Sequence, residues 1–162
     1  MNQQFKVGIL TISDSGSSGT RKDVSGQILE KIAVSNNLKI QLQEIIPDDF
    51  DKIQETLIEW SDNGEVDLIL STGGTGLGPR DRTPEATKLI LDIEVPGISE
   101  IMRIQTFSQT PFAVLSRSVS GVRSGCLIVN LPGSPSGVEQ CMNIILPSIN
   151  HALEMIRGWK TH

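Results

Sequence analysis

The chain has 162 residues, of which 38% are hydrophobic, and this length and composition suit one domain over residues 1–162. Its formal net charge of −5 argues against nucleic-acid binding, because that binding needs a basic surface to displace counterions from phosphates. No apolar run resembles a signal peptide or is long enough to span a bilayer, so we expect a cytoplasmic protein without a membrane partner.

Two short apolar runs in the first half of the chain, residues 6–13 and 67–71, are typical of buried strands, and a further strand is expected between them over residues 39–46. Two helical patterns separate them. The first begins near Val24 and ends before Asn36-Asn37, and the second covers residues 50–63 with apolar side chains at helical spacing. Strands that alternate with helices in this way indicate a parallel sheet with helices on both faces.

The second half continues the same alternation. The patterns predict helices near residues 84–91 and 97–107, an antiparallel excursion over 113–123, a buried strand at 126–131 and a C-terminal helix over 138–156. Pro147 should kink or split the last helix. The fold class that follows is α/β, a three-layer α/β/α sandwich with a mostly parallel central sheet.

Cysteine and histidine are too few for most metal or nucleophilic sites. Cys126 and Cys141 have no metal-ligand spacing, and both lie in apolar segments, which indicates buried, reduced thiols. With only two histidines in the chain, a histidine metal site or a Ser-His-Asp triad is hard to build.

Unusual polar residues follow four of the predicted strands, at the ends where open α/β sheets bind ligands. They are Ser13 and Asp14 after the first strand, Asp48 after the second, Gly73, Gly74, Thr75 and Gly76 with Asp81 after the third, and Pro132, Gly133 and Ser134 after the last. One shared cleft would explain all four groups.

The glycine-rich loop at residues 73–76 would let backbone N–H groups approach an anion or a purine edge. Alternatively, its glycines only turn the chain from strand to helix. It is neither a Walker A loop, since no Gly-Lys-Ser/Thr follows, nor the spaced Rossmann fingerprint. The turn at residues 132–134 offers a second anion-holding place, unless Ser136 and Glu139 merely cap the helix after it.

Asp48 and Asp81 are the carboxylates best suited to Mg²⁺, which prefers one or two carboxylates together with water and phosphate oxygens. The pattern around Asp48 fits a helix start even better, with Asp48 as the N-cap and Asp51 reaching back to it. Asp81 has no evident structural task, because Thr83 and Pro84 supply the start of the next helix.

Two arginines, Arg117 and Arg123, lie close in sequence to a polar turn at Ser116. Such cations are what a phosphate-bearing or sulfur-bearing ligand needs, because a guanidinium forms strong, charge-assisted hydrogen bonds. The alternative is that both arginines are exposed and only solvated.

Six segments carry a family resemblance, and in this order they cover almost the whole chain. They are LTISDS at residues 10–15, IPD at 46–48, STGGTG at 71–76, PRDRTPEAT at 79–87, LSR at 115–117 and IVNLPGS at 128–134. Together they resemble the molybdopterin adenylyltransferase family, of the MogA type and the gephyrin G domain. The resemblance implies a molybdopterin-binding domain that forms a homotrimer, with molybdopterin and nucleotide in one cleft.

The resemblance also implies roles for single residues. It makes Asp48 and Asp81 catalytic residues and metal ligands, and it assigns nucleotide binding to Gly73, Gly74, Thr75 and Gly76. The positions it places near molybdopterin are Ser13, Asp14, Ser116, Arg117, Pro132, Gly133 and Ser134. Arg82 departs from the family pattern, in which an apolar residue is expected between the aspartate and the threonine.

The implied function belongs to molybdenum cofactor biosynthesis. It is the Mg²⁺-dependent adenylylation of molybdopterin by ATP, which gives adenylated molybdopterin and pyrophosphate. The product would pass to the metal-inserting enzyme of the pathway. Two alternatives stay open: a non-catalytic molybdopterin-binding carrier or scaffold of the same fold, and a structural or regulatory module.

Overall fold

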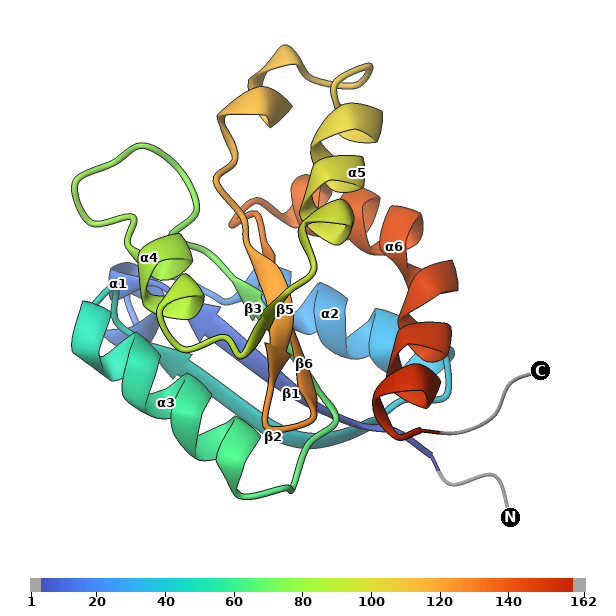
Figure 1. The fold of residues 1–162 in the computed structure, drawn as a ribbon. Coiled ribbons are helices and arrows are strands. Elements are labelled where there is room, and N and C mark those ends of the chain that lie inside the picture. Colours follow the sequence, from blue (N-terminus) through green and yellow to red (C-terminus); the bar gives the residue numbers. More distant parts are fainter. Residues whose placement is uncertain (1–3, 159–162) are drawn as a thin grey trace.

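The computed structural model describes residues 4–158, and its central feature is one six-stranded sheet in the order β2-β1-β3-β6-β5-β4 (Figure 1). The strands are β1 (Lys6–Ile12), β2 (Lys39–Ile46), β3 (Leu68–Thr72), β4 (Ile93–Glu94), β5 (Ser120–Arg123) and β6 (Cys126–Leu131). β2, β1, β3 and β6 are parallel, whereas β5 is antiparallel to β6 and β4 is antiparallel to β5. The predicted mostly parallel sheet is confirmed.

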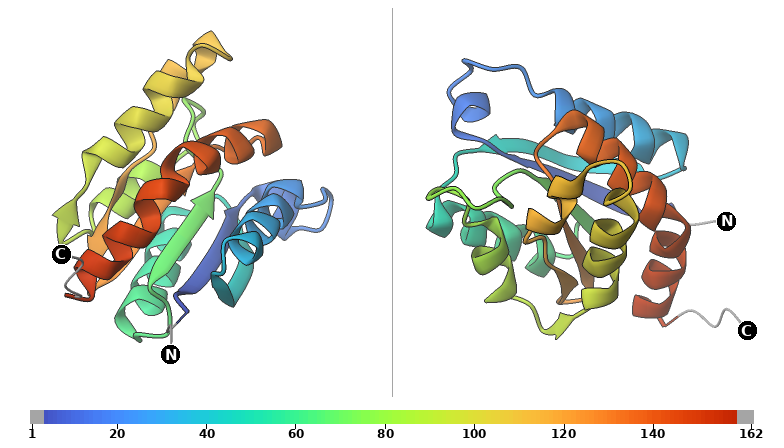
Figure 2. Two further views of the ribbon diagram at one scale, coloured as in Figure 1. Left: turned by 90° about the vertical axis from the view of Figure 1, so that its right-hand side faces the viewer. Right: turned by 90° about the horizontal axis from the view of Figure 1, so that it is seen from above.

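Helices cover both faces of this sheet, which confirms the three-layer α/β/α architecture (Figures 1 and 2). They are α1 (Asp14–Ser17), α2 (Val24–Ser35), α3 (Phe50–Asp62), α4 (Thr83–Lys88), α5 (Pro96–Thr106), α6 (Pro135–Ile156) and the 3-10 helix η1 (Pro111–Leu115). One hydrophobic cluster joins the sheet to α2, α5 and α6, and a second joins the opposite face to α3 and α4.

The central strands are apolar along their length because helices cover both of their faces. Successive side chains point to opposite faces, so Ile9 lies in the cluster with α2 and α6 while Leu10 lies in the cluster with α3. Leu68, Ile69 and Leu70 of β3 are all 0% exposed. Full burial of each such side chain stabilises the fold by about 1.5–3 kcal/mol. This packed centre fixes where the strands end.

The antiparallel part of the sheet is smaller than the sequence predicted. Within the excursion predicted over residues 113–123, only β5 is a strand, and η1 precedes it. Ser124 and Gly125 connect β5 to β6 with positive φ angles of 48° and 77°, the backbone conformation that a tight hairpin turn requires. The two-residue strand β4 was not predicted, because so short a segment has no periodicity to detect.

Helix α6 continues through Pro147, so of the predicted kink or split, the split is wrong. The proline removes the helical donor for the carbonyl of Asn143, four residues earlier. Both residues are exposed, and water can therefore satisfy that carbonyl. Within residues 4–158, no helix combines the length and the apolar character that crossing a bilayer requires.

Cys126 and Cys141 are free and buried, as predicted. Burial raises the pKa of the Cys126 thiol to about 12 and that of the Cys141 thiol to about 11. The thiolate is the reactive form of cysteine, and at neutral pH it is scarce at both positions. Neither cysteine is therefore a candidate nucleophile.

Candidate functional site

The carboxyl ends of the four parallel strands surround a cavity of about 400 Å³, here called the carboxylate cavity. Its lining includes Ser13, Asp48, Gly73, Gly74, Asp81, Gly133 and Ser134. These residues come from all four strand ends, because β2, β1, β3 and β6 are consecutive in the sheet. Members of each of the four predicted groups thus line this cavity, whereas Asp14, Thr75, Gly76 and Pro132 do not, and the individual roles stay predictions.

A second cavity of about 440 Å³, here called the serine cavity, lies between α5, η1 and the start of α6. Its polar lining includes Ser99, Arg103, Thr106, Ser116, Ser118, Ser134, Ser136 and Gln140. Ser134 lines both cavities, and a third depression lined by Asp81 and Ser116 adjoins them. The predicted site residues are therefore divided among these three neighbouring hollows, except Asp14 and Arg117, which line none of them.

The glycine-rich loop after β3 needs its glycines for the turn. Gly73 has a φ of +103° and Gly74 a φ of +67°, both in the region that side chains disfavour. A Cβ on Gly73 would lie 2.1 Å from the backbone oxygen of Ile12. These glycines are therefore needed to turn the chain after β3. It leaves open a ligand role as well, because a loop without Cβ atoms also admits a ligand to the backbone.

Gly73→Ala is expected to lower the free energy of unfolding by on the order of 3 kcal/mol, through its clash with Ile12 in addition to the unfavourable φ. The matched control is Gly64→Ala, since Gly64 also has positive φ but no atom within 4 Å of the added methyl. That control should cost only about 1 kcal/mol. Urea denaturation of both variants tests this, and equal losses would contradict the clash.

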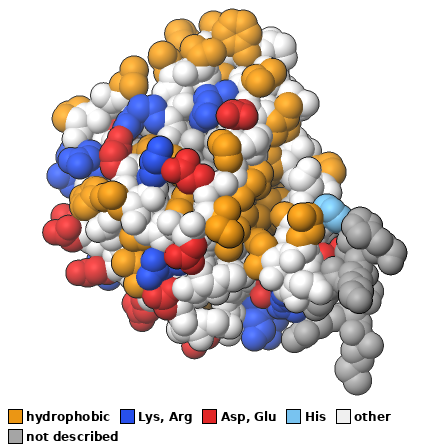
Figure 3. All heavy atoms as spheres, in the orientation of Figure 1, with side chains coloured by type: hydrophobic (Ala, Val, Ile, Leu, Met, Phe, Trp, Pro, Cys, Tyr) orange, Lys and Arg blue, Asp and Glu red, His pale blue; other side chains and the backbone are white. Residues whose placement is uncertain are grey.

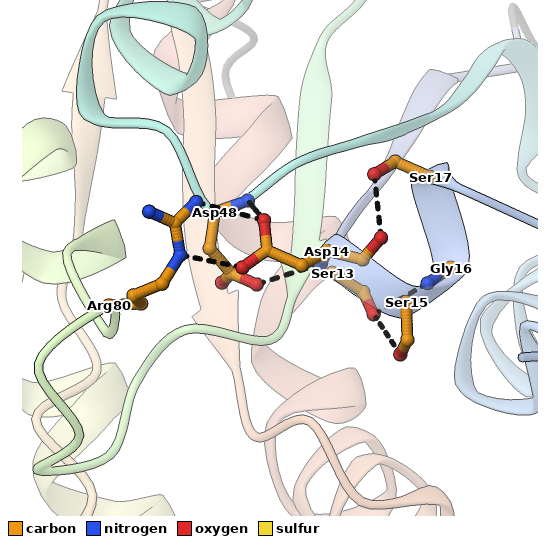
Figure 4. Close-up of polar contacts among 7 residues, drawn as sticks. All are labelled: Ser13, Asp14, Ser15, Gly16, Ser17, Asp48 and Arg80. Carbon is orange, nitrogen blue, oxygen red and sulfur yellow. Dashed lines mark hydrogen bonds and ion pairs between the residues drawn. The ribbon is translucent and has the colours of Figure 1, made fainter. Parts of the chain in front are cut away.

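Asp48 is not the N-cap of α3, so the capping role favoured from the pattern is wrong. The neighbouring Asp49 caps the helix, and its carboxylate accepts a hydrogen bond of 2.8 Å from the N–H of Lys52. The Asp48 Oδ2 atom instead accepts from the N–H of Asp14 at 2.9 Å (Figure 4). Its Oδ1 atom faces the glycine loop, 3.2 Å from where a Cβ on Gly74 would lie.

The electrostatic surroundings of Asp48 are unusual for a carboxylate. Burial raises the pKa of Asp48 above its ordinary value, and the charges of Asp14 and Asp81 raise it further. The hydrogen bond from Asp14 and the charge of Arg80 oppose this rise. Like charges gathered in a half-buried cleft are favourable for a cation, which would relieve their repulsion.

Asp81 does have a structural task, contrary to the prediction. Its Oδ2 atom accepts a hydrogen bond of 2.8 Å from the N–H of Gly78 and so closes the loop between them. Thr83 does not cap α4 either, because the N-cap position is Arg82, which makes no side-chain capping bond. The Thr83 hydroxyl donates to the Gly73 carbonyl at 2.9 Å, which ties α4 to the glycine loop.

Arg117 lies beside the site, but its guanidinium is already engaged. It donates to the carbonyl oxygens of Gly76 at 2.8 Å and Asp81 at 2.6 Å, and it forms an ion pair with Glu85. Arg117 therefore holds the loop that carries Asp81. Arg123 lies at the opposite end of the strands, beside the amino end of β6, and pairs with Asp62 at 2.8 Å, so a shared ligand-binding role for the two arginines is wrong.

Two serines near the cavities have capping roles. Ser13 caps α1, and its Oγ accepts from the N–H of Gly16 at 3.0 Å. Ser134 caps α6, and its Oγ accepts from the N–H of Gly137 at 3.1 Å, so the predicted cap by Ser136 and Glu139 is wrong. Both capping serines line the carboxylate cavity, which fixes their side chains at its wall.

Three cationic residues of the cavities were not singled out from the sequence. Arg21 and Lys22 line the carboxylate cavity from the segment before α2, and Arg103 lines the serine cavity from α5. No local pattern marks them, because exposed basic residues are common in loops and on helices. Within residues 4–158, no group of three or more His, Cys, Asp or Glu side chains is arranged to hold a metal ion.

Comparison with known proteins assigns the chain to a family. Residues 8–151 match the family model described as "Probable molybdopterin binding domain". The chain belongs to this family. A member from Helicobacter pylori (strain J99), named molybdopterin adenylyltransferase, is 38% identical to it over 96% of this chain and 90% of its own length. The molybdenum cofactor biosynthesis protein B of Halalkalibacterium halodurans is 36% identical over 91% of this chain and 88% of its own.

Solved structures of the molybdopterin-binding family have the same fold. The crystal structure of the molybdopterin biosynthesis enzyme MoaB from Thermus thermophilus superimposes with a TM-score of 0.91 at 46% identity, over 97% of this chain and 100% of that one. The chain is a member of the MogA and MoaB group of molybdenum cofactor biosynthesis, as the resemblance implied.

Proposed function

We propose that this protein transfers the adenylyl group of ATP to molybdopterin and releases pyrophosphate. A phosphate oxygen of molybdopterin forms the new bond to the α-phosphorus of ATP, and the bond from that phosphorus to the pyrophosphate oxygen breaks. The observation that carries this proposal is the pair of cavities that share Ser134, one of which contains Asp48 and Asp81. The relatives named molybdopterin adenylyltransferase support it.

We assign ATP to the carboxylate cavity and the adjoining glycine loop. The backbone N–H groups of Gly74, Thr75 and Gly76 donate to no acceptor within residues 4–158, so all three are available to phosphate oxygens. Arg21 and Lys22 add positive charge at the same cavity. Phosphoryl chemistry is governed by positioning and charge neutralisation, and it needs no protein nucleophile.

The donor set of Asp48 and Asp81 fits Mg²⁺. Both line the carboxylate cavity, and each keeps an Oδ1 atom that accepts no hydrogen bond from residues 4–158. Two carboxylates completed by water and substrate phosphate are a donor set that Mg²⁺ prefers. When bound, the ion would neutralise charge on the phosphates. The two aspartates would hold it while the glycine loop orients the nucleotide.

We assign molybdopterin to the serine cavity. The groups that line it include the hydroxyls of Ser116, Ser118 and Ser134, the ring of Phe112 and the guanidinium of Arg103, whose Nη1 also donates to the carbonyl oxygens of Ser116 and Ser118. Hydroxyls and a guanidinium suit a phosphate, and an aromatic ring gives a planar pterin an apolar face. Pro132 and Gly133 lie on the walls that the adjoining cavities share. A phosphate placed at Ser134 would lie at the boundary with the nucleotide.

We also propose a homotrimer, as the family resemblance implies, and hand-over of the product to the metal-inserting enzyme of the pathway. Exposed apolar side chains gather over α5 and η1, the region at the top of Figure 3. They are Ile104, Phe107, Phe112, Val114 and Leu115. Contiguous exposed apolar surface of this kind supports a protein contact at this face.

Purified protein incubated with molybdopterin, ATP and Mg²⁺ is expected to form adenylated molybdopterin and pyrophosphate, and chelation should stop the reaction. The chain has a net charge of −5 and presents two carboxylates to two polyanionic substrates, so the reaction should depend steeply on a divalent cation. Molybdopterin should still bind without the metal, because serine hydroxyls and backbone N–H groups can hold one phosphate. Mass spectrometry of the pterin and a pyrophosphate assay measure the two products.

A molybdopterin carrier is the second candidate, because some close relatives carry the name molybdenum cofactor biosynthesis protein B, which states no reaction. The same titration separates the two functions. For the enzyme, pyrophosphate must appear only when molybdopterin is present. Molybdopterin binding without any pyrophosphate, whichever divalent metal is added, would contradict adenylylation and support the carrier.

A further inference from the structure

Asp14 and Arg80 form a contact that connects the two segments carrying the candidate catalytic aspartates (Figure 4). Arg80 donates through Nε to Asp14 Oδ2 at 2.6 Å and through Nη2 to Asp14 Oδ1 at 2.9 Å. Asp14 in turn exchanges two hydrogen bonds with Asp48. Its N–H donates to Asp48 Oδ2 at 2.9 Å, and its Oδ1 accepts from the N–H of Asp48 at 3.0 Å.

Arg80 immediately precedes Asp81 in the loop of residues 76–82. Within the described residues, it is the member of this loop whose side chain hydrogen-bonds to the β1–α1 junction. Arg117 holds the same loop from the other side, through the carbonyl oxygens of Gly76 and Asp81. The ion pair of Arg80 with Asp14 therefore closes a chain of contacts that runs from the Asp81 loop to the carboxylate of Asp48.

We propose that Arg80 and Asp14 are positioning residues, which hold the Asp81 loop against the Asp48 segment so that the two carboxylates face one cleft. The inference rests on the proposed adenylyl transfer for its effect on rate. It gives Asp14 a different role from the contact with molybdopterin that the family resemblance implies. Both carboxylate oxygens of Asp14 are already bound by Arg80 and Asp48, whereas each of Asp48 and Asp81 keeps one oxygen without a hydrogen-bond donor in residues 4–158.

Electrostatics explain why the loop needs such a contact. Asp14, Asp48 and Asp81 are three carboxylates in one region, and the latter two line the same cavity. Their mutual repulsion favours an open loop. The guanidinium of Arg80 opposes it, and its planar, two-point contact with Asp14 fixes a direction as well as a distance. A displacement of about 1 Å in a catalytic group can cost roughly 100-fold in rate.

The same ion pair should matter little for global stability. Its side chains are 62% and 46% exposed, and exposed pairs contribute at most about 1 kcal/mol to the free energy of unfolding. A positioning role and a stabilising role are therefore separable by experiment. Arg82 supplies a matched control, because it is two residues further on and its guanidinium lies 5.1 Å from the centre of the Phe50 ring instead of on a carboxylate.

The test compares Arg80→Met, Asp14→Asn, their double variant and the control Arg82→Met in the full chain. Amide hydrogen exchange over residues 77–82 is measured without ligands, and adenylylation is measured at saturating ATP and Mg²⁺. We expect faster loop exchange and a rate lower by roughly 10- to 100-fold in both single variants, with KM for molybdopterin unchanged. The rate of the double variant should be no lower than that of the less active single variant, because both changes break the same contact.

The control Arg82→Met should keep wild-type exchange and rate, and the unfolding temperature of every variant should stay within about 4 °C of wild type. Unchanged loop exchange in Arg80→Met would overturn the proposal, even if the wild type forms no adenylated product and the proposed function itself fails. A rate lost in Arg80→Met but kept in Asp14→Asn, together with a raised KM for ATP, would also overturn it. That outcome would make Arg80 a direct ATP ligand.

Discussion

Asp48→Asn is expected to lower the rate of adenylylation by roughly 100-fold or more, because a metal-binding charge is worth several kcal/mol of transition-state stabilisation. The unfolding temperature should stay at or above that of the wild type. Asparagine keeps a carbonyl oxygen that can accept from the N–H of Asp14, and the change removes a half-buried charge that lies near Asp14 and Asp81. Steady-state kinetics and thermal unfolding measure the two effects.

The stability gain of this variant should depend on pH in a defined direction. Burial raises the pKa of Asp48 in the folded state above its ordinary value of 3.8, so the destabilisation by the ionised carboxylate grows as the pH rises above 3.8 and is complete above the folded pKa. Below pH 3.8 the proton is bound in both states, and the gain disappears. Asp49→Asn is the matched control, since asparagine caps a helix about as well as aspartate. Near wild-type turnover in Asp48→Asn would contradict the assignment.

Asp81→Asn is expected to reduce adenylylation to a similar degree, roughly 100-fold or more, without loosening its loop. The asparagine oxygen can still accept the hydrogen bond from Gly78, so this variant removes the charge and keeps the structural contact. Asp81→Ala removes both. Its rate should fall at least as far, and its hydrogen exchange over residues 77–82 should rise.

Comparing the two variants at Asp81 separates charge from loop structure. If Asp81→Asn retains near wild-type turnover while Asp81→Ala is inactive, the loop contact matters and the metal role of Asp81 is wrong. Direct binding of Mn²⁺, followed by its electron paramagnetic resonance signal with ATP present, gives a second measurement. The Asn variant should bind the ion more weakly than wild type does, because Mg²⁺ and Mn²⁺ sites depend on carboxylate charge.

The fold was predictable because its main elements have clear periodicity. β2 and β6 begin and end at the predicted residues, 39–46 and 126–131, since turn residues bound β2 and β6 is a continuous apolar run. β4 was missed because it consists of Ile93 and Glu94 alone. The excursion over residues 113–123 was predicted too long, because η1 is apolar like a strand but exposed at the surface.

Capping residues were predicted one or two positions away from where they are. Asp48 and Asp49 have equal capping propensity, and the same is true of Ser134 and Ser136. The structure selects Asp49 and Ser134, because the position at which each strand leaves the sheet determines where the following helix begins. Because Asp49 caps α3, the Asp48 side chain can line the carboxylate cavity instead. A local pattern carries no such information.

The partners of charged residues were the least predictable part of the site. Arg80 reaches Asp14 across 66 residues of sequence, and Arg117 reaches Gly76 across 41. Such contacts depend on the completed sheet order, in which β1, β3 and β6 are neighbours. The positions of polar residues at strand ends could be predicted, whereas the pairs they form could not.

The pairing of β3 with β6 has a consequence for how the chain folds. Thr72 at the end of β3 donates to the carbonyl of Pro132 across 60 residues of sequence, and all of β3 pairs with residues 127–131 of β6. Until the ribosome has made β6, β3 is an unpaired edge strand whose side chains are all of the kind that the finished fold buries. Such an edge is a template for aggregation. Residues 132–134, which line the cavities, follow β6 directly and take their place only when β6 pairs with β3. The binding cavities are thus completed at the same late step that protects the nascent sheet.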